Sequence, residues 1–396
     1  MNKVIYLDNN ATTMVDPLVV QEMIPYFSEY YGNPSSMHDF GGKVSAKIKE
    51  ARERVKDFLG ANLSSEIVFT ASGSESANMA IRGVLEANKK QKHIITTKIE
   101  HPCVLNVYKT LEKEGYRVTY LSVDSEGNLD SQELDEAVCD ETVLVSIMYA
   151  NNETGVIFPV KELADIVKRK NSKTKVFVDA VQAAGKIPID VKDTQIDLMG
   201  ISGHKIHAPK GIGALYIRKG TIVLPLIIGG HQERGKRAGT ENVPYIIGLG
   251  KACELAQRAL SDEETRVKKL RDKLEQGIIK AVPNARLNAG VENRVPNTTN
   301  IGFQFIEGEL ILLHMSDAGI CASSGSACTS GSLEPSHVLR AMGVPFTALH
   351  GSIRFSLSRF TTEDEIDEVL KKLPIIIDKL NRLSPFQKEL KSLGAL

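Results

Sequence analysis

The chain has 396 residues, of which 42% are hydrophobic and 25% are charged, close to the averages of globular proteins. Its 49 basic residues equal its 49 acidic residues, so the net charge gives no sign of a nucleic-acid surface. No apolar run approaches the roughly 18 residues that a membrane span requires. We therefore expect a large globular core, and neither a nucleic acid nor a membrane as a partner.

The start of the chain and its cysteines bear on where the protein works. Only a short apolar stretch precedes Asp8, too short for the core of a signal peptide. The cysteines are odd in number and form no C-x-x-C pair, which argues against a disulfide framework and a zinc ribbon. They are Cys103, Cys139, Cys253, Cys321 and Cys328. We expect a cytoplasmic protein with at least one free thiol.

Hydrophobic periodicity predicts two helices near the start of the chain, over residues 17–30 and 44–59, with a loop between them. From residue 67 onward, short apolar runs alternate with helical patterns. The predicted strands are Ile67–Thr70, His93–Thr97, Val118–Val123, Val143–Ala150, Lys175–Ala180, Leu198–Ser202 and Gly213–Ile217. This alternation is typical of βαβ units, and it predicts an α/β fold with a mostly parallel seven-stranded sheet.

The pattern changes in the last third of the chain. Helical character dominates from Pro244 to about Ala281, after which predicted strands and helices mix. These are strands over 298–305 and 352–357 and helices over 309–318 and 363–380. We therefore predict a large domain over residues 16–255 and a smaller α+β C-terminal domain over residues 256–396.

Ligands of α/β proteins bind beyond the carboxyl ends of the strands, so unusual strand-to-loop junctions are candidate sites. The first follows Thr70, where Ser72-Gly73-Ser74 opens a predicted helix. Free N–H groups, hydroxyls and the helix dipole at such a turn suit a phosphate. An ordinary serine N-cap without a ligand explains this segment equally well.

Two further junctions carry charged groups. Asp179 ends an apolar strand, and a carboxylate that becomes buried there needs a cationic partner; a surface aspartate is the simpler alternative. Lys205 follows the next strand, where desolvation lowers a lysine pKa toward Schiff-base chemistry. His204 and His207 have H-x-x-H spacing, but a metal site lacks a third ligand nearby.

The fourth junction is the segment 322–332, which consists of small residues and carries Cys328. A Ser/Gly linker is the usual interpretation of such a composition, but a linker has no need of a reactive thiol. Taken together, an anion site, a strand-end acid and a strand-end lysine match the needs of pyridoxal 5'-phosphate. That cofactor requires a phosphate site, an acid at its pyridine nitrogen and a Schiff-base lysine.

At this point the chain resembles the cysteine desulfurases of the NifS/IscS type, which belong to the class-V aminotransferase group. The resemblance extends from Tyr6 to about Arg359. Its motifs are Tyr6–Thr13, Tyr31–Ser36, Glu100-His101, Asn151-Asn152-Glu153, Ser202-Gly203-His204-Lys205, Arg237-Ala238-Gly239-Thr240 and Ser324-Gly325-Ser326-Ala327-Cys328. It implies a pyridoxal-phosphate-dependent transferase of fold type I, in which residues 1–15 join the small domain.

The resemblance also implies roles for single residues. Catalytic roles fall to Cys328, Lys205 and His101. The cofactor would be held by Gly73, Ser74, His101, Asn152, Asp179, Gln182, Ser202, His204, Lys205 and, from the neighbouring subunit of a homodimer, Thr240. Asn152 and Arg354 would bind the substrate, L-cysteine, with Arg354 on its carboxylate.

The implied reaction converts L-cysteine to L-alanine and leaves a persulfide on Cys328. An iron–sulfur scaffold protein would accept the sulfur, and Cys328 would transiently ligate iron through its persulfide. Another fold-type I activity, selenocysteine lyase or class-V aminotransferase, is the alternative. A transaminase has no use for a thiol at position 328, which favours the desulfurase.

Overall fold

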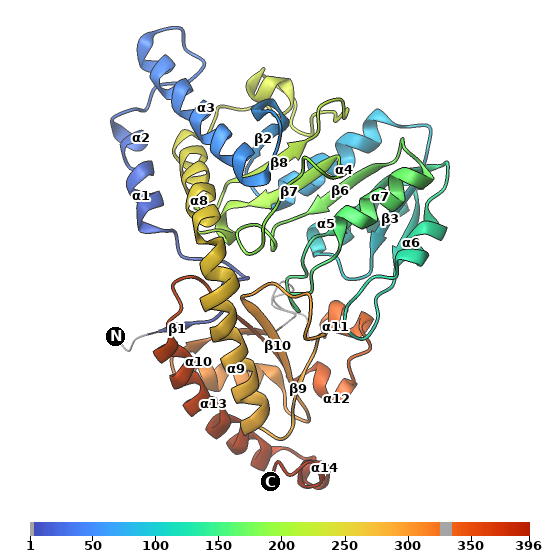
Figure 1. Cartoon of the computed structure of the whole chain (residues 1–396), viewed down its shortest axis with the longest axis vertical. Coiled ribbons are helices and arrows are strands. Elements are labelled where there is room, and N and C mark those ends of the chain that lie inside the picture. The colour runs from blue at the N-terminus through green and yellow to red at the C-terminus, as the bar shows by residue number, and fades with distance from the viewer. Residues whose placement is uncertain (1–3, 325–334) are drawn as a thin grey trace.

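The computed structural model describes residues 4–324 and 335–396. Its largest feature is a seven-stranded sheet with the order β2-β8-β7-β6-β5-β3-β4 (Figure 1). The strands are β2 (Ile67–Thr70), β3 (His93–Thr97), β4 (Arg117–Leu121), β5 (Thr142–Met148), β6 (Lys175–Asp179), β7 (Leu198–Ser202) and β8 (Gly213–Ile217). β8 alone runs opposite to the other six strands of this sheet. The predicted α/β fold with a mostly parallel sheet of seven strands is confirmed.

Both faces of this sheet are buried under helices, which explains why its strands are almost continuously apolar. Along β6 the side chains alternate: Val176 and Val178 pack into one hydrophobic cluster, and Phe177 packs into another. The Phe177 face is covered by α4 (Gly73–Ala87) and α5 (Pro102–Lys113). The opposite face is covered by α1 (Pro17–Met23), α3 (Asp39–Leu59), α7 (Val160–Lys170) and α8 (Val243–Asp262), with α6 (Ser131–Ala137) at its margin.

One predicted helix is divided in the structure. The sequence predicted a single helix over 17–30, but α1 ends at Met23 and a short helix α2 (Pro25–Ser28) follows. Pro25 has no backbone N–H to continue the hydrogen-bond ladder, and its ring opposes a continuous helix. The next helix, α3, begins earlier than predicted, because the His38 side chain accepts a hydrogen bond from the Gly41 N–H and caps it.

The C-terminal part contains smaller sheets. A four-stranded antiparallel sheet has the order β12-β13-β10-β9, and β1 pairs with β11 in parallel. The strands are β1 (Ile5–Tyr6), β9 (Ala285–Leu287), β10 (Thr298–Phe303), β11 (Ile320–Cys321), β12 (Ser323–Ser324) and β13 (Ser352–Ser356). The helices are α9 (Lys268–Ala281), α10 (Gly308–Asp317), α11 (His337–Ala341), α12 (Phe346–Leu349), α13 (Glu363–Leu383) and α14 (Gln387–Ser392).

The helical rod formed by α8 and α9 connects the two parts, as Figure 1 shows. Ala256 on this rod packs into the core of the large sheet, whereas Val267 packs into the core of the small part. We therefore propose that the domains divide at the π-helical turn Glu263–Val267, slightly after the sequence-based position. Ile5 and Leu7 also pack into the small core, as a segment that joins the small domain would do.

The fold brings several chain ends together at one place. The carboxyl ends of β5, β6 and β7 lie at the same edge of the parallel sheet, and α4 and α5 begin there.

Among the residues that the structure describes, no helix is long and apolar enough to cross a membrane.

Candidate active site

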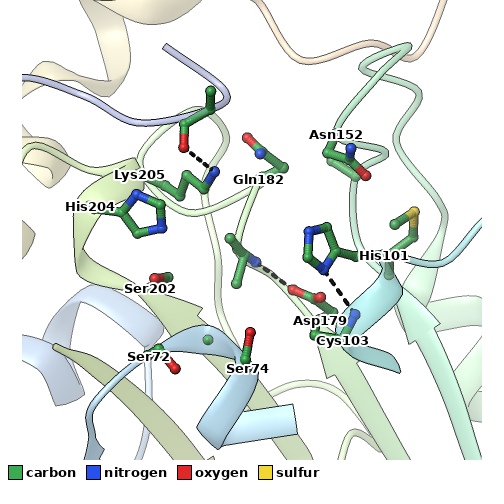
Figure 2. A pocket seen from close by; sticks show the side chains of 15 residues that line it. Ser72, Ser74, His101, Cys103, Asn152, Asp179, Gln182, Ser202, His204 and Lys205 are labelled. Atoms are coloured by element: carbon green, nitrogen blue, oxygen red, sulfur yellow. Dashed lines mark hydrogen bonds between the residues drawn. The ribbon is translucent and has the colours of Figure 1, made fainter. Parts of the chain in front are cut away.

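A cavity of about 270 Å³ lies at the carboxyl edge of the large sheet. Nine of the predicted site residues line it, and Figure 2 labels all of them except Gly73. The lining residues are Ala11, Ser72, Gly73, Ser74, His101, Cys103, Met148, Ala150, Asn152, Asp179, Val181, Gln182, Ser202, His204 and Lys205. The fold thus gathers residues from five separate junctions into one site.

One end of the cavity is formed by the N-terminus of α4. Ser72 caps this helix, with its Oγ accepting a hydrogen bond from the Glu75 N–H at 3.1 Å. Gly73 and Ser74 follow in the first turn, whose N–H groups have no intrahelical acceptor. A Cβ atom on Gly73 would lie 2.9 Å from Val181 Cγ2 and 3.2 Å from Ser202 Cβ. The first turn of α4 therefore offers N–H groups to an anion, and the close packing of Val181 and Ser202 on Gly73 excludes any larger residue at that position.

His204 adds a neutral donor near this end of the cavity. Its Nδ1 lies 3.2 Å from Thr12 Oγ1, and its main-chain carbonyl accepts a hydrogen bond from the Thr13 N–H at 2.9 Å. Burial, together with the positive charge of Lys205, lowers the pKa of His204 to about 4. At neutral pH this imidazole offers a hydrogen bond and no charge.

Asp179 is the last residue of β6, and its side chain is buried. One carboxylate oxygen accepts a hydrogen bond from the Val181 N–H at 3.0 Å. Burial raises the pKa of Asp179 to about 6, while the Val181 N–H and the charge of Lys205 oppose the rise. No salt bridge to Asp179 exists among the described residues, so this carboxylate is suited to a cationic ligand group.

Lys205 stands on the short turn Gly203–Lys205 that follows β7. Its Nζ donates hydrogen bonds to the main-chain carbonyls of Asn10 and Ala11, the latter at 2.8 Å (Figure 2). The carbonyl of Lys205 itself accepts a hydrogen bond at 3.0 Å from the buried ammonium of Lys186. The lysine is thus held at both its backbone and its side-chain end.

His101 caps α5 and lies on the cavity wall (Figure 2). Its Nδ1 accepts a hydrogen bond from the Cys103 N–H at 3.2 Å, so the neutral ring carries its proton on Nε2. Burial lowers the pKa of His101 to about 4, with the charges of Lys205, His337 and Arg354 acting in the same direction. The ring is therefore an uncharged group at neutral pH.

Cys103 is a lining residue that the sequence did not assign to the site. Burial raises the pKa of its thiol, and the carboxylates of Asp179 and Glu100 raise it further, so the thiol stays protonated. The sequence feature that could have placed Cys103 in the site is its position two residues after His101, in the first turn of the helix that His101 caps.

The N-terminal segment forms a second part of the wall that was not assigned. The Asn10 carbonyl accepts a hydrogen bond from Gln182 Nε2 at 3.0 Å, and Asn10 Nδ2 donates to the Asn152 carbonyl at 3.2 Å. Gln182 Oε1 is buried and has no hydrogen-bond partner among the described residues. An unsatisfied acceptor on a cavity wall indicates a place for a ligand group.

Arg354 lies just outside the cavity lining, on β13. Its guanidinium forms an ion pair of 2.8 Å with Asp8 and donates to the Asn152 carbonyl at 3.0 Å. Its Nε is buried without a hydrogen-bond partner in the described part of the chain. The guanidinium is therefore held beside Asn152, and its role toward a substrate carboxylate stays a prediction.

The remaining predicted residues are not brought into this cavity. Thr240 is exposed and does not line it, and its role from a neighbouring subunit stays a prediction. Cys328 lies outside the described residues, so its persulfide and its iron ligation both stay predictions. Within residues 4–324 and 335–396, no group of three or more histidine, cysteine or acidic side chains could hold a metal ion, so the H-x-x-H alternative gains no support.

Comparisons with known proteins agree with this picture. The family model of the class-V aminotransferases matches residues 5–369. A cysteine desulfurase of Nostoc sp. is 60% identical over 390 residues, covering 98% of this chain and 96% of that protein. The cysteine desulfurase NifS of Azotobacter vinelandii is 53% identical over 382 residues, covering 96% and 94%. A solved structure of a NifS-like protein has a TM-score of 0.90 and 43% identity, covering 95% of this chain and 100% of that chain.

Proposed function

The chain belongs to the class-V aminotransferase family, in its cysteine desulfurase branch, and we propose that it uses pyridoxal phosphate to convert L-cysteine to L-alanine. In this proposal the sulfur passes to Cys328 as a persulfide. The observation that carries it is the convergence of an anion-binding helix end, a buried carboxylate and a lysine on one cavity.

The cavity fits the proposed cofactor on several independent grounds. The first-turn N–H groups of α4 have no intrahelical acceptor and suit a phosphate, and Val181 and Ser202 pack so closely on Gly73 that no side chain fits there. The unpaired carboxylate of Asp179 suits a protonated pyridine nitrogen, and Gln182 presents a buried, unsatisfied amide oxygen. Lys205 lies on the same wall for a covalent link. Gly73, Ser74, Ser202 and His204 would hold the phosphate.

Pyridoxal phosphate, when bound, supplies an electron sink that labilises bonds at the substrate α- and β-carbons. The residues of the chain then have separate tasks. Asp179 would hold the proton on the ring nitrogen, and Lys205 would anchor the cofactor and move the proton at the substrate α-carbon. His101 is neutral and carries its proton on Nε2, so its ring is able to donate a hydrogen bond to a group bound in the cavity.

Substrate orientation falls to Asn152 and Arg354. Asn152 lines the cavity, and its carbonyl is the direct contact of the Arg354 guanidinium. We propose that Arg354 binds the carboxylate of L-cysteine, using the planar donor pattern that suits carboxylates. Its buried, unpartnered Nε provides a donor for this purpose.

The overall reaction balances with Cys328 as the sulfur acceptor. The carbon–sulfur bond of L-cysteine breaks, and a sulfur–sulfur bond forms on the Cys328 side chain. The electron pair of the broken bond stays on the β-carbon, which takes up a proton and becomes the methyl group of alanine. A thiolate performs this attack far better than a hydroxyl.

The identity of the sulfur acceptor follows from the same proposal. A persulfide on Cys328 is able to pass its terminal sulfur to a second protein, and we propose an iron–sulfur scaffold as the recipient. Transient iron ligation by the Cys328 persulfide would then belong to the transferred cargo. The predicted cytoplasmic location stays a prediction.

The proposal is tested by Cys328→Ser. The variant should bind pyridoxal phosphate and still change its absorbance when L-cysteine is added, because those events depend on Lys205 and Asp179. It should form no persulfide and release essentially no alanine, since it lacks a sulfur nucleophile. Labelled L-cysteine and peptide mass spectrometry locate the sulfur in the wild type; label on Cys103 or another cysteine, and none on Cys328, refutes the mechanism. Unchanged amino-group transfer in the variant favours a transaminase instead.

A further inference from the structure

Outside the cavity, a buried pair joins the start of α11 to the turn that carries Asn152. Ser336 Oγ donates a hydrogen bond of 2.5 Å to Glu153 Oε2. Both side chains are buried, and Ser336 also caps α11 by accepting hydrogen bonds from the N–H groups of Val338 and Leu339. The Ser336 hydroxyl thus uses its donor on Glu153 and its acceptor capacity on the helix.

A second contact begins at the next residue. His337 Nε2 donates a hydrogen bond of 2.9 Å to the main-chain carbonyl of Glu100, since a carbonyl only accepts. Glu100 directly precedes His101, and Glu153 directly follows Asn152. The two contacts therefore fix the start of α11 to the residues that adjoin two members of the cavity wall.

The position of these contacts along the chain suggests their purpose. Ser336 is eight residues after Cys328. Ahead of that cysteine, Ser323 of β12 pairs with Arg354 of β13, the residue proposed to bind the substrate carboxylate. The chain is thus held beside the site at residues 323–324, before Cys328 in the sequence, and again at residues 336–337, after it.

Neither contact has a task in the chemistry proposed above. Neither Glu153 nor His337 lines the cavity: Glu153 accepts the hydrogen bond of Ser336, and the hydrogen bond of His337 goes to the main-chain carbonyl of Glu100. A buried carboxylate paired with one hydroxyl is costly to keep unless the pairing is useful, because burial alone disfavours the charge. Positioning of α11 relative to the site accounts for both contacts at once.

We propose that Glu153 and His337 are positioning residues for sulfur transfer, which set the approach of Cys328 by fixing Ser336 and His337 against the Asn152 turn and the Glu100 carbonyl. This inference rests on the proposed function. It assigns to these residues the step in which Cys328 takes the substrate sulfur, and not the binding of cofactor or L-cysteine.

The test uses the holoenzyme and separates those two stages. Glu153→Leu removes the acceptor and leaves the Ser336 cap in place, whereas Glu153→Gln keeps an oxygen that accepts from the hydroxyl. His337→Phe removes the donor to Glu100, whereas His337→Gln keeps an N–H. Stopped-flow absorbance after addition of L-cysteine follows the first stage. Single-turnover mass spectrometry of the Cys328 peptide follows the second.

For Glu153→Leu and His337→Phe we expect persulfide formation to slow at least tenfold, with the rate of the absorbance change within twofold of wild type. Glu153→Gln and His337→Gln should form persulfide within threefold of wild type. Thr362→Ala is the matched control, because Thr362 caps α13 in the same manner, and its persulfide rate should be unchanged.

Two results overturn the inference: unaltered persulfide formation in both disruptive variants, or an equal loss of both stages, which a general structural defect produces. If one disruptive variant does not yield folded holoenzyme, the other decides. If the wild type itself produces neither alanine nor persulfide from L-cysteine, the proposed function has failed, and that outcome is distinct from either of these.

Discussion

The Asp179 carboxyl group shows how a single residue is prepared for chemistry. It is buried at the end of β6, receives one hydrogen bond from the Val181 N–H, and has its pKa raised to about 6 by burial. A carboxylate in this state gains from a cation that it touches, because the ion pair offsets the loss of hydration. A protonated pyridine nitrogen is such a cation, and holding that proton strengthens the electron sink.

We expect Asp179→Asn to keep the fold and the shape of the cavity but to lose the negative charge. Alanine formation should fall by about 100-fold or more, a typical effect of removing one electrostatic contact at a reacting centre. Retention of pyridoxal phosphate during dialysis should also weaken. Turnover and dialysis of the purified variant check this, and near-normal turnover would count against the assigned role.

At the scale of elements, the first turn of α4 is arranged for an anion. The residues Ser72-Gly73-Ser74 place a cap, a residue without a side chain and a hydroxyl in sequence at the helix end. The helix dipole adds a favourable potential for negative charge at this position. Val181 and Ser202, from two neighbouring junctions, close around Gly73 and leave no space for a Cβ atom.

Gly73→Ala should therefore weaken the binding of pyridoxal phosphate by about tenfold or more, because the new methyl group displaces Val181 or the helix end. Gly42→Ala is the matched control: Gly42 lies in α3, and a Cβ atom there meets no atom within 4 Å. The control should bind the cofactor normally and gain about 0.5–1 kcal/mol in free energy of unfolding. Cofactor titration and urea unfolding measure the two effects; equal cofactor affinity in both variants would disprove the phosphate assignment.

At the scale of the whole molecule, several carboxyl groups are buried without a full set of partners. Glu100 Oε2 and Glu263 Oε2 have no hydrogen-bond partner among the described residues. Burial raises the pKa of Glu100 to about 8, and the pKa values of Glu153 and Glu263 to about 7. These groups hold a proton more tightly in the folded chain than in the unfolded chain.

The free energy of unfolding should consequently fall as the pH rises from 6.5 to 7.5. A raised folded pKa contributes stability that is complete below the unfolded value and is lost as the pH passes the folded value, by up to about 1.4 kcal/mol per pH unit for each proton. The lowered pKa values of His101 and His204, about 4, act in the opposite direction, most strongly between pH 4 and 6.5 and progressively less above pH 6.5. Urea unfolding of the cofactor-free protein at both pH values measures the slope.

Glu263→Gln provides the check on this assignment, because it removes one of the titrating groups without changing a residue that lines the cavity. The slope of stability against pH should become shallower in this variant. A wild-type stability that is constant or rises between pH 6.5 and 7.5 would contradict the assignment.

The apolar surface of the molecule bears on its assembly. The segment 222–228 exposes several large apolar side chains, among them Ile222 at 67% and Ile228 at 85%. Exposed apolar groups that gather on one segment mark a contact surface. Thr240 is exposed on the chain shortly after this segment, as expected of a residue that serves a neighbouring subunit.

We expect sedimentation to show a homodimer and Ile228→Glu to shift it toward monomer with loss of alanine formation, because a buried charge disfavours the interface. Val291→Glu, at an exposed position of similar degree elsewhere, should leave the dimer intact. A fully active wild-type monomer at assay concentration would show that the site needs no second subunit.

The sequence by itself determined the sheet and most of the cavity wall. Strands such as Leu198–Ser202 are recognisable because a strand buried on both faces is a continuous apolar run, a local property of the chain. Asp179 and Lys205 stand at the ends of such runs, so their common location followed from the parallel order of the strands. The specific chemistry came from the resemblance, above all from the motif that ends at Cys328.

Only the tertiary structure decided which distant groups complete the site. The carbonyls of Asn10 and Ala11 that hold Lys205 lie 195 and 194 residues away along the chain. The ion pair of Arg354 with Asp8 spans 346 residues. Main-chain carbonyls carry no sequence signal, because every residue has one, and pairings between remote segments depend on how the two cores pack together. The neutral state of His101 and the place of Cys103 in the wall depend on the same packing, since burial sets both.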